Sequence, residues 1–336
     1  METISHLAVG PMSRTIIEAV YSYSHKYQTP LMLIASKNQV DWASGYVLTT
    51  KEIGRYANQL RKVYSQAVVY LCRDHCGPGF NGNNTLKDVY STIDEDISSG
   101  FNLIHVDLCH LRGGYDRILT TSRKVIEYIL RNSPLTLIEI GTDENNGKYY
   151  KDLKKIEQEM QFFTSISQPY FYVTQTGSLI KEDEQVGSFE RSYVQKIRSL
   201  ATKYKLHLKE HNADYLTLRE ISKRRGLIDA VNIAPQLGVI QTQLTLQKAL
   251  LYGLNTKPFL EKAYQSHKWK KWLYKNTAVN KHLCSVIAGH YVFNSLEYLQ
   301  LFDELNKCED FTGEIEGAMY SVFKLYHNLK SGIISS

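Results

Sequence analysis

Eight short apolar runs recur through the first 233 residues, and they constrain the fold of this chain more than any other feature. The runs are Ile4 to Val9, Leu31 to Ala35, Ala67 to Leu71, Asn102 to Val106, Leu135 to Ile140, Tyr170 to Val173, Lys205 to Leu208 and Leu227 to Ile233. Each has the length of a buried strand, and stretches with helical periodicity separate them. This alternation predicts parallel strands joined by helical crossovers, and eight strands are the number that closes a (βα)8 barrel, or TIM barrel.

The expected crossover helices have recognisable beginnings and ends. Examples of the helical stretches are Ser13 to Tyr27, Thr50 to Gln66, Thr120 to Arg131 and Asp152 to Phe163. The segment Thr49 to Glu52 fits a helix N-cap, and Asn132 to Pro134 fits a helix end. Gly100 and Gly226 stand where a helix C-cap precedes a strand.

The pattern changes after Ile233, because Gln243 to Lys330 reads as helices with no further strand. We therefore expect a barrel over residues 1–242 and a helical extension packed on it over residues 243–336. A chain of 336 residues with 43% hydrophobic content fits one barrel of about 250 residues plus such an appendage. The segment His282 to Leu301 could reach over a barrel end or form a subunit contact.

Composition excludes several classes of protein. A formal charge of +6 is mild, and the basic and aromatic cluster His267 to Lys275 is interpreted as a helix that buries its tryptophans, so nucleic acid is not an expected partner. No apolar run approaches the roughly 18 residues of a membrane span, and no signal-peptide pattern opens the chain. Five cysteines favour free thiols. We expect a cytoplasmic protein.

Polar side chains gather at the ends of the expected strands, which is where such a barrel carries its chemistry. They include Asn38, Gln39, Asp74, His75, His105, Asp107, Glu139, Glu144, Gln175, Glu210, His211 and Asn232. Imidazoles and carboxylates bind a divalent metal, and amides hold the hydroxyl groups of a polyhydroxylated substrate. Taken singly, His105 and His207 are interpreted as buried histidines satisfied by neighbours. Lys209 could form a Schiff base, although an ion-paired or surface lysine is the favoured interpretation.

Several phrases occur in the order seen in one family. They are Asn38-Gln39-Val40, Asp74-His75-Cys76-Gly77-Pro78, Ile104-His105-Val106-Asp107, Ile140-Gly141-Thr142, Gln175-Thr176-Gly177, Glu210-His211-Asn212-Ala213-Asp214-Tyr215 and Asn232-Ile233-Ala234-Pro235. On these motifs the chain resembles the accessory, non-catalytic subunits of class II tagatose-bisphosphate aldolase over about residues 1–300. It more remotely resembles the class II fructose- and tagatose-bisphosphate aldolases. The resemblance implies a TIM barrel and sugar-phosphate chemistry.

The resemblance also implies roles for individual residues. In the catalytic class II aldolases three histidines hold a zinc ion that polarises the substrate carbonyl. Carried over by motif, His75 and His211 are similar to metal ligands, and Glu139 is similar to a carboxylate that approaches the metal. Asp74 and Glu144 are similar to the residues that move protons. Zinc or another divalent metal is the implied cofactor.

Substrate-binding candidates complete the expected site. They are Asn38, Gln39, Gln175, Gly177 and Asn232. Gln175 stands where the aldolases have a histidine ligand, and Ala234-Pro235 replaces the Asp-Thr that follows the aldolase asparagine. Asn212 to Tyr215 replaces a Gly-Gly-Ser-Gly phosphate loop, and Asp214 would repel a phosphate, so the phosphate binds elsewhere or the substrate lacks one.

Two hypotheses follow. The first is an enzyme, an aldehyde-lyase that uses a divalent metal to cleave or form a carbon–carbon bond in a ketose or sugar phosphate. The second is a non-catalytic subunit that binds and stabilises a separate catalytic tagatose-bisphosphate aldolase subunit. The expected partners are thus a sugar or sugar phosphate and either a second copy of the chain or a catalytic aldolase subunit. The enzyme hypothesis is favoured, because a scaffold has no physical need for an acid, imidazoles and amides at one barrel mouth.

Overall fold

A computed structural model describes residues 3–142, 147, 149, 152–274 and 279–330. Its centre is a closed barrel of eight parallel strands, so the predicted fold class is confirmed. In order around the barrel the strands are β1 (Leu7–Val9), β12 (Ala230–Ile233), β11 (His207–Glu210), β8 (Phe171–Val173), β7 (Leu137–Gly141), β6 (Leu103–Val106), β5 (Val69–Cys76) and β2 (Leu31–Ser36). The first strand closes the ring against the last, with Leu7 opposite Val231 and Val9 opposite Ile233.

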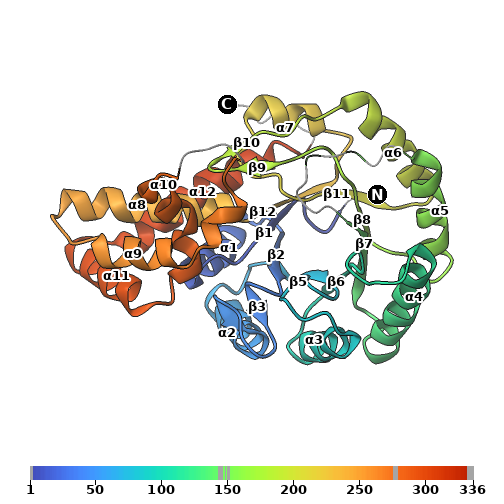
Figure 1. The fold of residues 1–336 in the computed structure, drawn as a ribbon, viewed down its shortest axis with the longest axis horizontal. Helices are drawn as coiled ribbons and strands as arrows, with labels where there is room; N and C mark the ends of the chain where they lie inside the picture. The colour runs from blue at the N-terminus through green and yellow to red at the C-terminus, as the bar shows by residue number, and fades with distance from the viewer. Residues whose placement is uncertain (1–2, 143–146, 148, 150–151, 275–278, 331–336) are drawn as a thin grey trace.

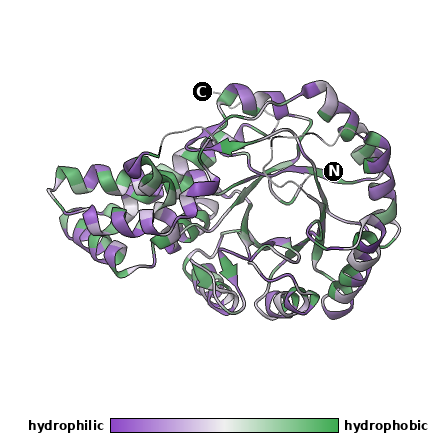
Figure 2. Ribbon diagram, viewed as in Figure 1, coloured by the Kyte–Doolittle hydropathy of each residue, from purple (hydrophilic) through white to green (hydrophobic). Residues whose placement is uncertain are grey.

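A helix follows each barrel strand, which confirms the predicted alternation. The helices are α1 (Arg14–Tyr27), α2 (Thr50–Val63), α3 (Leu86–Ser98), α4 (Tyr115–Asn132), α5 (Leu153–Thr164), α6 (Arg191–Lys203), α7 (Leu218–Arg224) and α8 (Pro235–Leu251). Figure 1 shows α2 to α7 in a ring around the strands, and Figure 2 shows hydrophobic residues along those strands. Two small sheets pair β3 (Val40–Asp41) with β4 (Leu48–Thr49) and β9 (Ile180–Lys181) with β10 (Glu184–Gln185).

The predicted helix signals act as expected. Thr49 and Glu52 form a complete capping box at the start of α2, in which each side chain accepts from the other residue's backbone N–H. Helix α4 ends at Asn132, before the proline that cannot continue it. Gly100 and Gly226 have φ values of 81° and 74°, in the left-handed region that favours glycine.

The third barrel strand is longer than predicted. The sequence placed its end at Leu71, but β5 continues to Cys76, so Asp74 and His75 lie within the strand. The prediction was wrong because a charged residue, Arg73, interrupts the apolar run. The Arg73 guanidinium is fully buried and is satisfied by Asp96 and by backbone carbonyl groups, which allows the strand to continue.

Alternate residues of each strand face the interior of the barrel. The apolar residues that pack together there are Ala8, Met32, Ile34, Cys72, Leu103, Phe171 and Ala230. Two residues further along the strands, the same face carries Asp74 after Cys72, His105 after Leu103 and Asn232 after Ala230. Strand periodicity therefore stacks a polar layer directly on an apolar one.

The chain after the barrel forms a helical extension. It comprises α9 (Lys257–Gln265), η1 (Lys268–Lys271), α10 (Lys281–Ala288), η2 (Gly289–Val292), α11 (Leu296–Cys308) and α12 (Phe311–His327). Figure 1 shows α8 to α11 to one side of the barrel. Helix α8 runs across the expected boundary at residue 242, so the last barrel helix leads directly into the extension. Trp269 and Trp272 are buried, as expected.

Membrane-spanning helices were not expected, and among the described residues no helix combines the length and apolar character needed to cross a bilayer.

Buried ion pairs join the strands to the helices outside them. Arg73 on β5 makes two hydrogen bonds to Asp96 on α3, at 2.8 and 2.6 Å, and both side chains are fully buried. Arg224 on α7 contacts Glu210 on β11 in the same bidentate way, at 2.6 and 2.8 Å. Removal of one partner would leave the other charge buried without compensation.

We expect Asp96→Ala to lower the free energy of unfolding by about 3–5 kcal/mol, because Arg73 loses its counter-charge while it stays buried. Urea unfolding measures the change. The matched control is Glu157→Ala, which removes a partially exposed ion pair to Lys203 and should lower the free energy of unfolding much less. Equal effects of the two substitutions would contradict this account.

Candidate active site

Four side chains converge at the mouth of the barrel. Asp74, His75, His105 and His211 each offer a possible ligand atom, and these four atoms lie within 4.8 Å of one another. Asp74 and His75 come from β5, His105 from β6, and His211 directly follows β11. Strands β5 and β6 are neighbours, but β7 and β8 separate β6 from β11, so His211 reaches the other three residues only because the barrel closes.

A local irregularity brings two adjacent residues, Asp74 and His75, into the same cluster. The register of β5 against β6 shifts between Arg73 and Cys76, and His75 has a φ of 45°. A bulge of this kind redirects a side chain, and a positive φ is costly for a residue other than glycine. The backbone is therefore held in an unfavourable conformation at the point where the side chains of Asp74 and His75 both face the cluster.

Each histidine of the cluster has one ring nitrogen fixed by a neighbour. His75 Nδ1 lies 2.7 Å from Asp107 Oδ2. His105 Nε2 lies 2.8 Å from the Gly141 carbonyl oxygen. His211 Nε2 lies 3.0 Å from Glu139 Oε1. Such partners set the orientation of the ring and decide which nitrogen is left for a ligand.

The other ring nitrogens all face one carboxylate oxygen. Asp74 Oδ1 lies 3.7 Å from His75 Nε2, 3.4 Å from His105 Nδ1 and 3.7 Å from His211 Nδ1. His105 Nδ1 also lies 3.3 Å from the backbone N–H of His75, and His211 Nδ1 is buried without a hydrogen-bond partner. Three imidazoles and one carboxylate thus surround a single point.

A buried ion pair fixes the far side of the cluster. Lys209 Nζ lies 2.6 Å from Glu139 Oε2, and both side chains are fully buried. Burial by itself raises the pKa of Glu139, but Lys209 and His211 outweigh it and lower the pKa to about 2. Lys209 is therefore the ion-paired lysine that was expected, and Glu139 stays ionised as the hydrogen-bond partner of His211.

The remaining charges of the cluster favour one another. Burial alone would lower the pKa of His75, but Asp74 and Asp107 raise it to about 9. Burial alone would raise the pKa of the Asp74 and Asp107 carboxyl groups, yet His75 holds each pKa well below the usual range for aspartate. Burial lowers the pKa of His211, so that imidazole is neutral near pH 7.

The residues present fit a divalent metal ion. Imidazole nitrogen and carboxylate oxygen are the donors that zinc prefers, and histidine ligands in metal sites usually donate their second N–H to a carboxylate or carbonyl group. All three histidines here have such a partner, and His211 Nδ1 is an unpaired buried acceptor. A bound ion would replace the proton that His75 otherwise retains.

A cavity of about 220 Å³ opens beside the cluster. Asn38 and Gln39 line it from the barrel, although Asn38 donates to the Phe80 carbonyl oxygen and Gln39 accepts from the Ser36 N–H. Asn232 also lines it, and both polar atoms of its buried amide lack a partner. The size of this cavity suits a small ligand, since drug-sized pockets begin at roughly 300 Å³.

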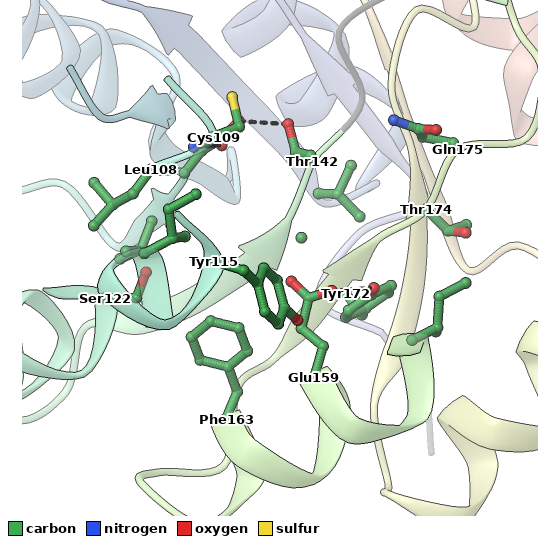
Figure 3. A pocket seen from close by; sticks show the side chains of 16 residues that line it. Leu108, Cys109, Tyr115, Ser122, Thr142, Glu159, Phe163, Tyr172, Thr174 and Gln175 are labelled. Carbon is green, nitrogen blue, oxygen red and sulfur yellow. Dashed lines mark hydrogen bonds between the residues drawn. The ribbon is translucent and has the colours of Figure 1, made fainter. Parts of the chain in front are cut away.

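Other predicted residues lie elsewhere. Gln175 lines a second cavity, of about 250 Å³, which α4 and α5 border and which also contains Glu159 and Tyr172 (Figure 3). Gly177 has a φ of 87°, and a Cβ there would meet Tyr149 at 2.5 Å, so the loop conformation requires glycine at that position. Glu144 lies outside the described residues.

Sequence reasoning undervalued several residues that the structure places at the cluster or cavity. His105 was interpreted as an ordinary buried histidine, although it shares a strand face with Leu103 and Asp107, and that alternation was a usable signal. His290 reaches the cavity from η2, within the segment for which a place over a barrel end or a subunit contact was considered, and Lys271 reaches it from η1. Nothing in the sequence indicated that Lys271 would lie there.

No protein-family model matches the sequence, but solved structures resemble its fold. A probable tagatose 6 phosphate kinase from Sinorhizobium meliloti 1021 has a TM-score of 0.76 at 16% identity, over 97% of this chain and 96% of that one. The fructose-bisphosphate aldolase from Campylobacter jejuni has a TM-score of 0.56 at 15% identity, over 90% of each chain. The YdjI aldolase from Escherichia coli K12 has a TM-score of 0.52 at 12% identity, over 91% and 94%. At these identities the likeness shows the fold.

The buried imidazole of His290 should make stability depend on pH. Burial, together with Lys271, lowers the pKa of His290 to about 3, so the folded chain keeps this ring neutral while the unfolded chain protonates it below about pH 6.5. Its contribution to stability is full above pH 6.5 and is lost as the pH falls toward 3, by about 1.4 kcal/mol per pH unit.

Urea unfolding at about pH 7 and about pH 5 checks this dependence of stability on pH. The free energy of unfolding of the native chain should fall more steeply with acid than that of His290→Gln. His282→Gln, which changes an exposed histidine, should follow the native curve. Parallel curves for the native chain and His290→Gln would contradict the prediction.

Proposed function

We propose that this chain is an aldolase-type carbon–carbon lyase that uses a divalent metal ion to cleave or form a bond in a ketose or sugar phosphate. One observation carries the proposal: three imidazoles, each fixed on its outer side, direct their other ring nitrogens at one carboxylate oxygen beside a cavity. The strand ends of a (βα)8 barrel are where such enzymes carry their chemistry. The likeness of fold to named aldolases supports the proposal by analogy.

In this proposal His75, His105 and His211 hold the ion, and Glu139 assists as the partner of His211. The ion supplies a Lewis acid for the substrate carbonyl group. Asp107, Gly141 and Glu139 keep the three rings in place, which matters because a ligand set has to be preorganised to act.

Asp74 is the proposed proton carrier. Its carboxylate is ionised, faces the three imidazoles and lines the cavity, so it can accept a proton from a substrate hydroxyl group as a bond breaks and return it in the reverse direction. Asn232, Asn38 and Gln39 lie along the cavity with amide groups that suit hydroxyl groups. The second proton-transferring role remains with Glu144 on the resemblance alone.

The second candidate is a non-catalytic subunit of a tagatose-bisphosphate aldolase. Gln175, at the position of an aldolase histidine, lies in a different cavity, which favours this alternative. Phosphoryl transfer, the activity in the name of the Sinorhizobium meliloti neighbour, receives less support. The described residues around the main cavity include Asp74 and Asp214 but only one lysine, Lys271, where a nucleotide's phosphates would need several positive groups.

Metal content tests the ligand set directly. We expect elemental analysis to find close to one divalent ion per chain in protein purified without chelator or histidine tag, as in a site with three protein ligands. His75→Ala, His105→Ala and His211→Ala should each lose it. Asp107→Ala, which removes only the partner of His75, should weaken metal binding by about 10- to 100-fold.

His282→Ala is the matched control, because it removes an exposed histidine and should leave the metal in place. A native chain that takes up no metal even on reconstitution would refute the metal-assisted reaction. That outcome would favour the non-catalytic subunit, and co-purification with a catalytic aldolase chain would then be the next measurement.

Asp74→Asn should lower turnover of a cleaved ketose or ketose phosphate by roughly a hundredfold, the usual effect of losing a general acid or base. Metal content should change little, because the three imidazoles remain. Steady-state kinetics on the metal-loaded chain measure the effect, with Asp116→Asn, at an exposed position, as control. An unchanged rate would show that Asp74 does not carry the proton.

A further inference from the structure

The extension places an unusual histidine in the wall of the main cavity. His290 is 1% exposed, lines the cavity, and has no hydrogen-bond partner at either ring nitrogen. Buried polar groups in folded proteins are nearly always paired, because an unpaired one loses its hydration without compensation. The side chain is therefore a candidate for contact with a ligand.

Close packing holds His290 in position. A Cβ on Gly238 of α8 would lie 2.5 Å from the Cβ of His290, so only glycine allows the histidine to approach that helix. Gly289 packs against Thr242 of α8 in the same way, since a Cβ there would lie 2.3 Å from the Thr242 hydroxyl oxygen. The Tyr291 ring is tilted against His290 with centroids 4.1 Å apart. The imidazole is thus fixed before any ligand binds.

The imidazole of His290 is chemically suited to bind a hydroxyl group. Burial, with Lys271 nearby, keeps the pKa of His290 at about 3, so the ring is neutral at neutral pH. A neutral imidazole presents one N–H donor and one nitrogen acceptor. A sugar hydroxyl group can both accept and donate, whereas a phosphate would offer acceptors only.

Asp214 occupies a position that would otherwise suit an anion. Its Oδ1 accepts hydrogen bonds of 2.9 Å from the backbone N–H groups of Ala234 and Gln236, at the start of α8. Barrel enzymes frequently bind phosphate at a helix N-terminus that follows the last strands. Burial raises the pKa of Asp214 to about 7, so its charge is only partial near neutral pH. The space and the two N–H donors that the carboxyl group takes up are what exclude a phosphate.

A lysine side chain also borders the cavity. Lys271 lines the rim and lies over the Trp272 and Tyr291 rings, at 4.6 and 5.7 Å from their centroids. An anionic group at the rim could pair with it. The binding test therefore has to separate recognition by His290 from recognition by Lys271.

We propose that His290 of the extension and Asp214 of the barrel together determine which sugar end enters this cavity: His290 binds a hydroxyl group of an unphosphorylated end, and Asp214 keeps a phosphate from the start of α8. The inference rests on the proposed function for the ligand being a sugar. It goes beyond that function in assigning two residues of this chain to selectivity and in requiring at least one sugar end without a phosphate.

Calorimetry on the native chain with the metal present tests the inference. The probes are a ketohexose, its 1-phosphate, its 6-phosphate and its 1,6-bisphosphate. We expect the free sugar or one monophosphate to bind at least about tenfold more tightly than the bisphosphate, because the cavity accepts a phosphate at no more than one end of the sugar. Tighter binding of the bisphosphate than of every other probe, with the advantage lost in Lys271→Ala, would overturn the proposal.

Two substitutions at position 290 separate contact from packing. His290→Phe keeps a ring in the space and should weaken binding of the preferred probe by about tenfold, the effect of one hydrogen bond. His290→Gln keeps a donor and an acceptor and should restore most of the affinity. His282→Phe is the control. Unchanged affinity in His290→Phe, with a folded chain by circular dichroism, would refute the assigned contact.

Two substitutions at position 214 separate occupancy from charge. Asp214→Gly frees both N–H groups of α8 and should raise bisphosphate affinity relative to the free sugar. Asp214→Asn removes the charge but still occupies the donors, so its selectivity should move less. If Asp214→Gly folds and has the same selectivity as the native chain, the role of Asp214 is refuted. If Asp214→Gly does not fold, the same result in Asp214→Ser refutes that role.

The outcomes distinguish this inference from the proposed function. Binding that follows the expected pattern without any metal-dependent cleavage would leave the selectivity standing and remove the aldolase activity. Cleavage of the bisphosphate in preference to the other probes would keep the activity and overturn the selectivity. No binding of any probe up to about 10 mM, above the usual range of Michaelis constants, would overturn the inference.

Discussion

The pairing of β1 with β12 is the constraint on which the rest of this structure depends. Because the first strand closes the ring against the last, the carboxyl ends of all eight strands share one rim. Asp74 and His211 are far apart in the chain, yet closure brings Asp74 Oδ1 to 3.7 Å from His211 Nδ1. Strand periodicity then sets the apolar layer of the interior below this rim. An open sheet of the same strands would leave Asp74 and His211 far apart along one edge, with β6, β7 and β8 between their strands.

Buried charges connect the stability of the barrel to the geometry of its mouth. An ion pair such as Lys209 with Glu139 costs desolvation that its attraction offsets only when geometry is good, so it is weak evidence for added stability. Here the pair also fixes an orientation, since the second oxygen of Glu139 holds His211 Nε2 at 3.0 Å. The bulge at His75 has a similar character, because an unfavourable backbone conformation directs a side chain toward the cluster. At both places, a feature that is unfavourable by itself holds a side chain of the cluster in position.

The extension is part of the cavity as well as an appendage. Lys271, Trp272, His290 and Tyr291 all line it, although they follow the last strand by dozens of residues. The approach of η2, which carries His290 and Tyr291, depends on Gly238 and Gly289, where any side chain would separate α8 from η2. Structural neighbours of low identity share this fold, and a shared fold does not determine what a protein binds.

The sequence by itself determined the barrel, the helical extension and the strand ends at which polar groups gather, because strand and helix periodicity are local properties. It also identified Asp74, His75 and His211, which lie together, and Asn232, which lines the cavity. Only the tertiary structure decided that His105 joins them and that Gln175 lies in another cavity. It also decided that Asp214 caps α8 and that His290 enters the wall. Those outcomes depend on which distant segments meet, and a pattern along the chain carries no information about contacts that barrel closure and helix packing create.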